Sequence, residues 1–506
     1  MKSKGMVYLV GAGPGNPGLL TLRAAELLSK ADVVLHDALV SPEILRMAPK
    51  SAEIIYAGKR ASVHSIPQEE LNELLVKKAK AGKNVVRLKG GDPYVFGRGG
   101  EEAEGLVAAK IDFEVVPGVS SVVGAACYAG IPITHRDYCS SYTVITGHED
   151  PSKKESDIDW ESMAKIPGTK VILMGVGRLE EISRRLIAGG MKASTPTAVI
   201  QWGTLGKQKS IEAKLDKIAK AVSKEGITPP GVIVIGDVVG LRNRLNWFEK
   251  RALFGQRIVV TRSRDQSSQL AHELRELSAE VLEIPTIRIV PPDDLSGLKD
   301  AILELNSYNW IVFTSPNGVT AFFDYFFKGF EDLRDIGGVR IAAVGPATAA
   351  KLTELHLKVD VMPREYVGVQ VAKALADFES VENLNILLMR AEAASEDLPA
   401  ALEALGGIVD DIACYKTIPE TDDSSGDVAN LLEQGADWIT FTSSSTVDNF
   451  HARFDLPKMV KKFPGTKLAS IGPETSKALI ALGLKANVEA KPHTIEGLVD
   501  ALKKVE

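Results

Sequence analysis

The first half of the chain alternates short apolar runs with amphipathic stretches. The apolar runs are VYLVGAG (7–13), ADVVLHD (31–37), NVVRLKG (84–90), FEVVPG (113–118), TVITG (143–147), KVILMG (170–175), TAVIQWGT (197–204) and GVIVIGD (231–237). Parallel strands covered on both faces give such uninterrupted runs, and helices fill the segments between them. The pattern therefore predicts an α/β fold built on buried parallel strands.

A second α/β region begins near residue 257, with the strand pattern RIVVTRSR. The preceding segment LRNRLNWFEKRALFGQ (241–256) is rich in charged and aromatic residues. We place the domain boundary near residue 250, because about 250 residues on each side suit two modules.

The second half repeats itself. WIVFTSPNGVTAFF (310–323) resembles WITFTSSSTVDNFH (438–451), and VRIAAVGPATAAKLTELHL (339–357) resembles TKLASIGPETSKALIALGL (466–484), at nearly the same spacing. Repeats of this length indicate two similar α/β lobes, since solenoid units are much shorter. A ligand site is expected between the lobes.

Composition narrows the choice of function. The net charge of −6 argues against a nucleic-acid-binding protein held by a broad basic field. Glycines interrupt the apolar run of the opening MKSKGMVYLVGAGPG, unlike a signal peptide, so we expect a cytoplasmic protein.

The three cysteines, Cys127, Cys139 and Cys414, form neither a disulfide framework nor a zinc pattern, and buried thiols are the simplest expectation. His135 lacks companions at metal-ligand spacing, so no metal is expected.

The glycine-rich segment VGAGPGNPGLLT (10–21) follows a strand and precedes a helix. It is not a complete dinucleotide fingerprint, because Asn16 stands where the third glycine of G-x-G-x-x-G belongs. Taken alone, it fits a structural tight turn as well as a ligand-binding loop.

Eight motifs in order make the first half more specific. They are the segment 10–40, then YAGKR, RLKGGDPYVFGRGGEE, VVPGVSS, GIPITHRDY, ILMGVGRL, TPTAVIQWGT and PPGVIVIGDVV. Over residues 5–245 this set resembles the uroporphyrinogen-III C-methyltransferases of the tetrapyrrole methylase superfamily. The resemblance implies two α/β lobes with S-adenosylmethionine between them.

The resemblance also implies a set of cofactor residues. They are Pro14, Gly90, Gly91, Asp92, Val95, Ser120, Ser121, Met174 and Gly203. Glycines let the backbone approach a ligand closely, and a carboxylate such as that of Asp92 accepts ribose hydroxyls or balances a cationic ligand. For Met174, an ordinary core methionine is an equal alternative.

Proton transfer must accompany methylation of a ring carbon, and the family match places Asp37 and Lys59 as the acid–base pair. A helix cap is the alternative role for Asp37. The substrate carries eight carboxylates, so basic side chains should orient it, with solvated surface charge as their alternative role. Besides Lys59, the candidates are Arg60, Arg87, Arg98 and Arg136.

Residues 255–506 resemble the uroporphyrinogen-III synthases, through GQRIVVTRSRD (255–265), the two FTS motifs, the two GP motifs and ACYKT (413–417). The resemblance implies residues 1–250 as the methyltransferase and 251–506 as the synthase. Within the synthase it implies one lobe of about 255–288 plus 418–506 and another of about 291–414, joined by connectors near 284–290 and 414–418.

Synthase chemistry needs a shaped, polar cleft more than a strong acid or base, and no cofactor. Hydroxyls near helix starts are candidates to bind substrate carboxylates, although capping those helices is the simpler role of each. These candidates are Thr314, Ser315, Thr442, Ser443, Ser444 and Thr475. By resemblance, Tyr415 is the candidate for proton handling, with packing in the core as its alternative.

Together the two halves predict a bifunctional enzyme. The second half would convert hydroxymethylbilane into uroporphyrinogen III, and the first would methylate that product twice to precorrin-2. The alternatives are another precorrin methyltransferase and a second half that is a tetrapyrrole-binding sensor without chemistry. We expect a homodimer through the methyltransferase half, no nucleic-acid or membrane partner, and hand-off to a separate precorrin-2 dehydrogenase or chelatase on the sirohaem, cobalamin or haem d1 branch.

Overall fold

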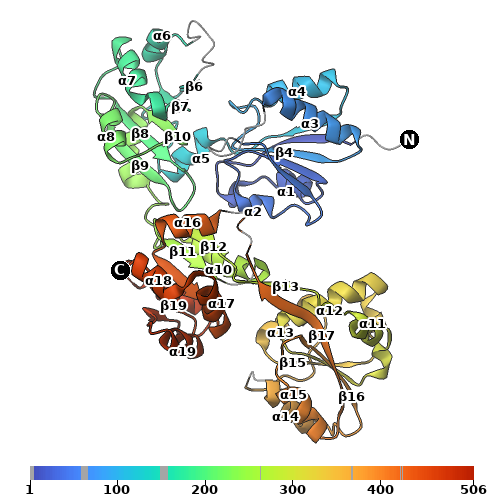
Figure 1. The fold of residues 1–506 in the computed structure, drawn as a ribbon. Helices are drawn as coiled ribbons and strands as arrows, with labels where there is room; N and C mark the ends of the chain where they lie inside the picture. Colours follow the sequence, from blue (N-terminus) through green and yellow to red (C-terminus); the bar gives the residue numbers. More distant parts are fainter. Residues whose placement is uncertain are drawn as a thin grey trace.

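The computed structural model describes residues 5–58, 67–148, 158–261, 264–365, 368–421, 423 and 426–505. It contains four five-stranded sheets, each flanked by helices, so the α/β class predicted from the sequence is confirmed (Figure 1). Among the described residues no helix is both long and apolar enough to span a membrane.

The first sheet is parallel throughout, in the order β3-β2-β4-β1-β5. Its strands are β1 (Val7–Gly11), β2 (Val33–His36), β3 (Glu53–Tyr56), β4 (Val85–Lys89) and β5 (Phe113–Val116), and its helices are α1 (Leu22–Leu28), α2 (Pro42–Leu45), α3 (Gln68–Lys80) and α4 (Gly99–Ala108). The central strands β1 and β4 are almost wholly buried, which explains their unbroken apolar runs.

The second sheet is mixed, in the order β6-β7-β10-β8-β9. Its strands are β6 (Tyr142–Thr146), β7 (Thr169–Leu173), β8 (Pro196–Gln201), β9 (Lys209–Lys214) and β10 (Gly231–Ile235), and helices α5 (Ser121–Tyr128), α6 (Trp160–Lys165), α7 (Leu179–Ala188), α8 (Ile218–Lys224) and α9 (Arg242–Leu245) accompany it. Strand β10 pairs antiparallel with both β7 and β8. The prediction of parallel strands is therefore wrong here, because a strand buried on both faces has the same apolar run in either direction.

The third sheet is parallel and takes its strands from two distant segments, in the order β12-β11-β18-β19-β20. The strands are β11 (Arg257–Val260), β12 (Glu280–Glu283), β18 (Trp438–Phe441), β19 (Lys467–Ser470) and β20 (Val488–Glu489), and the helices are α10 (Arg264–Glu276), α16 (Asp427–Gln434), α17 (Ser444–Phe454), α18 (Leu456–Lys462), α19 (Pro473–Ala481) and α20 (Ile495–Lys503).

The fourth sheet has the order β13-β17-β16-β14-β15. Its strands are β13 (Ile287–Val290), β14 (Trp310–Phe313), β15 (Arg340–Ala343), β16 (Asn385–Ala391) and β17 (Ile408–Pro419), with helices α11 (Ser296–Leu303), α12 (Pro316–Gly329), α13 (Pro346–Glu354), α14 (Gly368–Phe378) and α15 (Asp397–Ala404). The antiparallel pair of β13 and the end of β17 runs toward the third sheet (Figure 1).

The sequence repeat corresponds to equivalent structure in the two lobes. Strand β14 leads into α12 through the N-cap Ser315, and β18 leads into α17 through the N-cap Ser443. Both serine side chains accept backbone N–H groups of the helix that follows, which satisfies donors left unpaired at a helix start. Each FTS motif therefore fixes a turn at the carboxyl end of a buried strand.

The cysteines differ in exposure. Cys414 is fully buried, and burial raises the pKa of its thiol to about 12, so this thiol stays protonated. Cys127 is exposed and Cys139 is half-buried. The expectation of buried thiols is thus wrong for Cys127, which lies near the end of the short helix α5.

Candidate functional site

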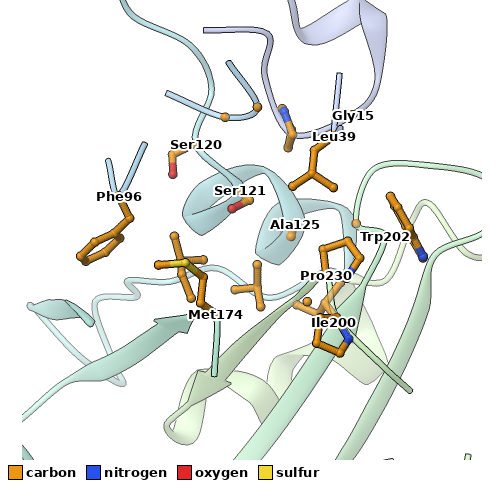
Figure 2. A pocket seen from close by; sticks show the side chains of 18 of the residues that line it. Gly15, Leu39, Phe96, Ser120, Ser121, Ala125, Met174, Ile200, Trp202 and Pro230 are labelled. Carbon is orange, nitrogen blue, oxygen red and sulfur yellow. The ribbon is translucent and has the colours of Figure 1, made fainter. Parts of the chain in front are cut away.

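A cavity of about 570 Å³ lies between the first and second sheets. It is lined by loops that follow strands β1, β4, β7 and β8, together with the start of α5 (Figure 2). All nine residues that the sequence predicts as cofactor-binding line this cavity, from Pro14 to Gly203. Loops at the carboxyl ends of strands in two separate sheets thus face one cavity.

Three non-glycine residues on the wall of this cavity have left-handed backbone conformations. The φ angles are +53° at Phe96, +56° at Met174 and +49° at Trp202. Such conformations cost of order 1 kcal/mol or more each and gather where a binding site requires them. Their clustering marks the cavity as a functional site independently of any sequence motif.

Met174 is 51% exposed and lines the cavity (Figure 2). A core methionine would be buried among other side chains, so that alternative is wrong. Its position directly after β7, together with its strained backbone, presents a flexible apolar side chain to the cavity.

The GGD turn is held by its own aspartate. Asp92 accepts hydrogen bonds from the backbone N–H of Tyr94 at 2.8 Å and of Gly118 at 3.0 Å, so its carboxylate ties the β4 loop to the β5 loop. Gly91 has a φ of +69° and exchanges backbone hydrogen bonds with Gly13. A Cβ built on Gly91 would lie 3.8 Å from the nearest protein atom, the backbone nitrogen of Ser121, so the main chain there is left bare on its cavity side.

We expect Gly91→Ala to weaken binding of an S-adenosyl ligand about tenfold or more, because the methyl group would occupy space that the bare main chain leaves open. Calorimetry with S-adenosylhomocysteine measures the effect. The matched control is Gly483→Ala, where φ is +73° and a Cβ would meet nothing within 4 Å, so both variants carry similar backbone strain. Equal affinities of the two variants for S-adenosylhomocysteine would show that Gly91 has no part in ligand binding.

Asp37 lies at the end of β2 and lines a second, adjoining cavity of about 750 Å³. Its carboxylate accepts a hydrogen bond from the Arg87 guanidinium at 2.6 Å. No helix-cap bond involves this side chain; in α2 that role belongs to Ser41, which accepts from Glu43. The structure thus excludes the cap of α2 as the role of Asp37.

Arg87 is 4% exposed and also bonds the buried carboxylate of Glu102. Lys89, on the same strand, donates to that carboxylate at 2.7 Å, and burial, followed by the neighbouring Arg87 cation, lowers the pKa of Lys89. Two cations, Arg87 and Lys89, and two carboxylates, those of Asp37 and Glu102, therefore form one network. Arg87 is not a solvated surface charge, and its guanidinium is held by protein carboxylates.

The other predicted basic residues are dispersed. Arg98 is an exposed residue paired with Glu101 at 2.5 Å, and Arg136 is exposed in the turn between His135 and Cys139. Neither lines the two cavities described above. Lys59 and Arg60 lie outside the described residues.

Several cavity residues were missed by sequence reasoning. Trp202 and Leu205 line both cavities, while Phe96 and His148 line the first. Trp202 is part of the TPTAVIQWGT motif, so its place directly after an apolar strand pattern was a usable signal. His148 follows an ordinary strand end, and nothing in its spacing marks it.

In the second half, the structure brings together two of the predicted residues. The Ser315 hydroxyl and the Tyr415 hydroxyl are 3.0 Å apart, joining the start of α12 to β17. Tyr415 is 8% exposed, and burial raises the pKa of its phenol above the ordinary value. The phenol is therefore neutral near pH 7 and able to donate a hydrogen bond.

The remaining hydroxyl candidates lie on both lobes. Thr314, the neighbour of Ser315 in the chain, donates to the backbone oxygen of Met389 at 3.4 Å. On the other lobe, Thr442 and Ser443 are half-buried, Ser444 is exposed at the start of α17, and Thr475 is buried within α19. Among the described residues no cluster of three or more His, Cys, Asp or Glu suits a metal ion.

Comparison with known proteins assigns both halves. Residues 6–219 match the family model of the Tetrapyrrole (Corrin/Porphyrin) Methylases, and residues 268–500 match that of Uroporphyrinogen-III synthase HemD. The chain is 40% identical over 503 residues to the Porphyrin biosynthesis protein HemD of Ruminiclostridium josui, which covers 99% of this chain and 98% of that one.

Further relatives match the first half alone. An S-adenosyl-L-methionine-dependent uroporphyrinogen III methyltransferase of Methanosarcina barkeri is 53% identical over 48% of this chain and 94% of its own. A solved uroporphyrin-III C-methyl transferase of Thermus thermophilus, in complex with S-adenyl homocysteine, is 40% identical, covers 47% of this chain and 100% of its own, and has a TM-score of 0.41.

The fold and these matches define a bifunctional protein of tetrapyrrole biosynthesis. The chain belongs to the fused tetrapyrrole methylase and uroporphyrinogen-III synthase family, with the methylase in its first half and the synthase in its second.

Proposed function

We propose that the second half cyclises hydroxymethylbilane to uroporphyrinogen III with inversion of the last pyrrole ring. The first half then methylates uroporphyrinogen III twice, using S-adenosylmethionine, to give precorrin-2. The observation that carries this proposal is a pair of adjoining cavities, one lined by the nine predicted cofactor residues and the other lined by Asp37 together with residues of the second half.

The first cavity fits S-adenosylmethionine in size and character. Its volume of about 570 Å³ is in the range of small-molecule sites, and the bare main chain at Gly91 leaves room for close approach. When bound, the sulfonium supplies an activated methyl group. The loop residues Gly90, Gly91, Ser120 and Ser121 would hold the ligand on one side, with Met174 and Gly203 on the other.

Asp37 is the proposed proton-handling group of the methyltransferase. Its carboxylate lies in the second cavity, next to the loop residue Leu39 that also lines the first. The bond from Arg87 fixes one carboxylate oxygen and stabilises its charge, so the other oxygen is oriented to accept a substrate proton. Lys59 remains the proposed partner of Asp37. We assign Arg87 to positioning Asp37, and Arg60, Arg98 and Arg136 to attraction of the polycarboxylate substrate.

For the synthase half, we assign Tyr415 as the hydrogen-bond donor to the departing hydroxyl of hydroxymethylbilane. The buried phenol is neutral, and Ser315 holds its oxygen at 3.0 Å. We assign the hydroxyl of Thr314 on one lobe to hydrogen bonding with substrate carboxylates. We assign the hydroxyls of Thr442, Ser443 and Thr475 on the other lobe to the same role. No cofactor is needed for this reaction.

We expect Tyr415→Phe to lower synthase turnover only about two- to tenfold, because it removes one hydrogen bond worth roughly 0.5–1.5 kcal/mol while water can still protonate the leaving group. Stopped assays of uroporphyrinogen III formation measure the change. Tyr308→Phe is the control, since that phenol bonds Asp410 on the same lobe at 2.6 Å and is assigned no part in the reaction. A wild-type rate for Tyr415→Phe would contradict the assignment.

A coupled assay tests the function as a whole. The full chain is given hydroxymethylbilane with and without S-adenosylmethionine, and products are separated and weighed by mass spectrometry. We expect uroporphyrinogen III without the cofactor and precorrin-2 with it. Binding of hydroxymethylbilane without cyclisation would make the second half a sensor, and a different methylated product would make the first half another precorrin methyltransferase.

Two further expectations concern partners. We propose a homodimer formed through the methyltransferase half, and transfer of precorrin-2 to a separate dehydrogenase or chelatase. Size-exclusion chromatography with light scattering tests the first, and the second follows from the chemistry of precorrin-2, which must be oxidised before a sirohaem-type macrocycle forms.

A further inference from the structure

The two halves of the chain are in close contact at a glycine. Gly206 lies in the loop between β8 and β9, and a Cβ placed on it would lie 2.3 Å from the backbone of Ala279, directly before β12. No side chain fits at that distance without moving one half away from the other. The neighbouring residues Trp202 and Leu205 line both cavities described above, so this loop connects the cofactor cavity to the second half.

Ion pairs around Glu283 lie at the same contact. Glu283, at the end of β12, accepts hydrogen bonds at 2.7 Å from Arg46 of the first half and from Arg275 of α10. Arg275 also bonds Glu43 of α2 at 2.8 Å. The Glu283 side chain is 7% exposed while that of Arg46 is 41% exposed, so the contact is shielded from solvent only on its Glu283 side, and the pairs hold α2 against β12.

The second cavity is formed at this contact. Its first-half wall carries Asp37, Arg46 and Lys207, and its second-half wall carries Glu283, Pro285 and Val428. At about 750 Å³ it falls within the size range of sites for ligands of several hundred daltons. Part of the wall of the cavity that Asp37 lines is therefore supplied by the synthase half.

That wall is also linked to the synthase cleft. Pro285 follows β12 at the carboxyl edge of the third sheet, the edge at which β18 delivers Thr442 and Ser443. Arg453, on the helix that Ser443 begins, donates to the Pro285 oxygen at 3.1 Å. Pro285 is immediately followed by Thr286 and β13, the strand that joins the two synthase lobes (Figure 1).

We propose that the cavity between the halves is a transfer site for the tetrapyrrole, in which uroporphyrinogen III leaving the synthase half is received beside Asp37 before it mixes with the free pool. This inference rests on the proposed function and adds a route between its two reactions. The route is short because Glu283 and Pro285 of the synthase half line the cavity, and because the two halves are in contact at Gly206.

Lys207 provides the charge that a polycarboxylate needs there. Three carboxylates line the cavity: those of Asp37 and Glu283 are each bonded to arginine, which offsets their charge, and that of Asp423 accepts the backbone N–H groups of Val428 and Ala429. Lys207 lies with its ammonium 4.3 Å from the centre of the Trp202 ring, and among the described residues it has no ion pair. Its ammonium is thus the group on the cavity wall that is able to pair with a carboxylate of the passing tetrapyrrole.

An isotope competition in the full chain tests the transfer. Unlabelled hydroxymethylbilane, ¹³C-labelled uroporphyrinogen III and S-adenosylmethionine are supplied together, and the isotope ratio of precorrin-2 is compared with that of the free uroporphyrinogen III pool. We expect precorrin-2 to be at least threefold enriched in carbon from hydroxymethylbilane. Equal isotope ratios in product and pool would overturn the proposal.

Variants separate the transfer site from other causes. Lys207→Glu and Gly206→Ala are expected to bring the enrichment close to one, while Lys209→Glu, an equal charge change on the exposed start of β9, keeps it. Retained enrichment in both cavity variants would contradict the assigned route. Each substrate is also assayed alone. If the wild-type chain lacks either activity, the proposed function itself is disproved. If it has both activities but shows no enrichment, only the transfer is disproved.

Discussion

Replacing Asp37 by asparagine should lower the rate of methyl transfer at least a hundredfold while synthase turnover in the same chain stays within about twofold of wild type. Asparagine keeps the shape of the side chain but cannot accept a proton, and general acid–base groups typically contribute about 10²- to 10⁴-fold. It also leaves the Arg87 guanidinium with one charged partner fewer. Quenched-flow assays with S-adenosylmethionine and uroporphyrinogen III measure the effect.

Asp32 provides the control for this variant. It lies at the other end of β2, where its carboxylate accepts the backbone N–H of Asn84. Asp32→Asn should keep methyl transfer near the wild-type rate, because no predicted site residue contacts it. If Asp37→Asn and Asp32→Asn methylate equally well, Asp37 has no part in the reaction and the proposed acid–base site is misplaced.

Replacing Glu102 by glutamine should destabilise the first half by about 3–5 kcal/mol, because it leaves two buried cations without their shared carboxylate. The Glu102 side chain is 0% exposed and bonds both Arg87 and Lys89. Urea unfolding followed by circular dichroism measures the change as a lower midpoint of the transition that belongs to the first half.

The neighbouring residue gives a matched comparison for Glu102. Glu101 pairs with Arg98 on the surface, where both side chains are more than half exposed, so Glu101→Gln should change stability by less than about 1 kcal/mol. Similar midpoints for the two variants would mean that the Arg87–Lys89–Glu102 network contributes no more than a surface ion pair.

The apolar runs were sufficient to predict the α/β class, and the paired FTS and GP motifs were sufficient to predict the repeat in the second half. A run such as GVIVIGD identifies a buried strand because every position faces apolar side chains. It does not encode direction, since neighbouring strands supply equivalent burial whether they run parallel or antiparallel. The orientation of β10 follows from the long-range pairing with β7 and β8, which no local pattern contains.

The candidate site was predictable where its residues lie in strand-to-loop motifs. The GGD turn follows the buried strand β4, the Ser120–Ser121 pair follows the edge strand β5, and the fold brings them to one cavity. The role of Arg87 was less visible, although its position inside a buried strand, two residues before Lys89, indicates a paired charge rather than a free one. The wall that the second half adds was not predictable, because it depends on how the two halves pack.

The linker between the halves limits where the chain can be cut or recombined. Phe248 and Leu253 are each 2% exposed; Phe248 packs on Tyr128 of the first half and on Phe254, while Leu253 belongs to the apolar core beneath β11. A breakpoint anywhere between them would leave an aromatic or aliphatic surface open to water on one fragment. A chimera that takes its synthase half from another protein should therefore take the linker from that protein too, because Leu253 completes the core of the synthase half. It should also retain a glycine at position 206.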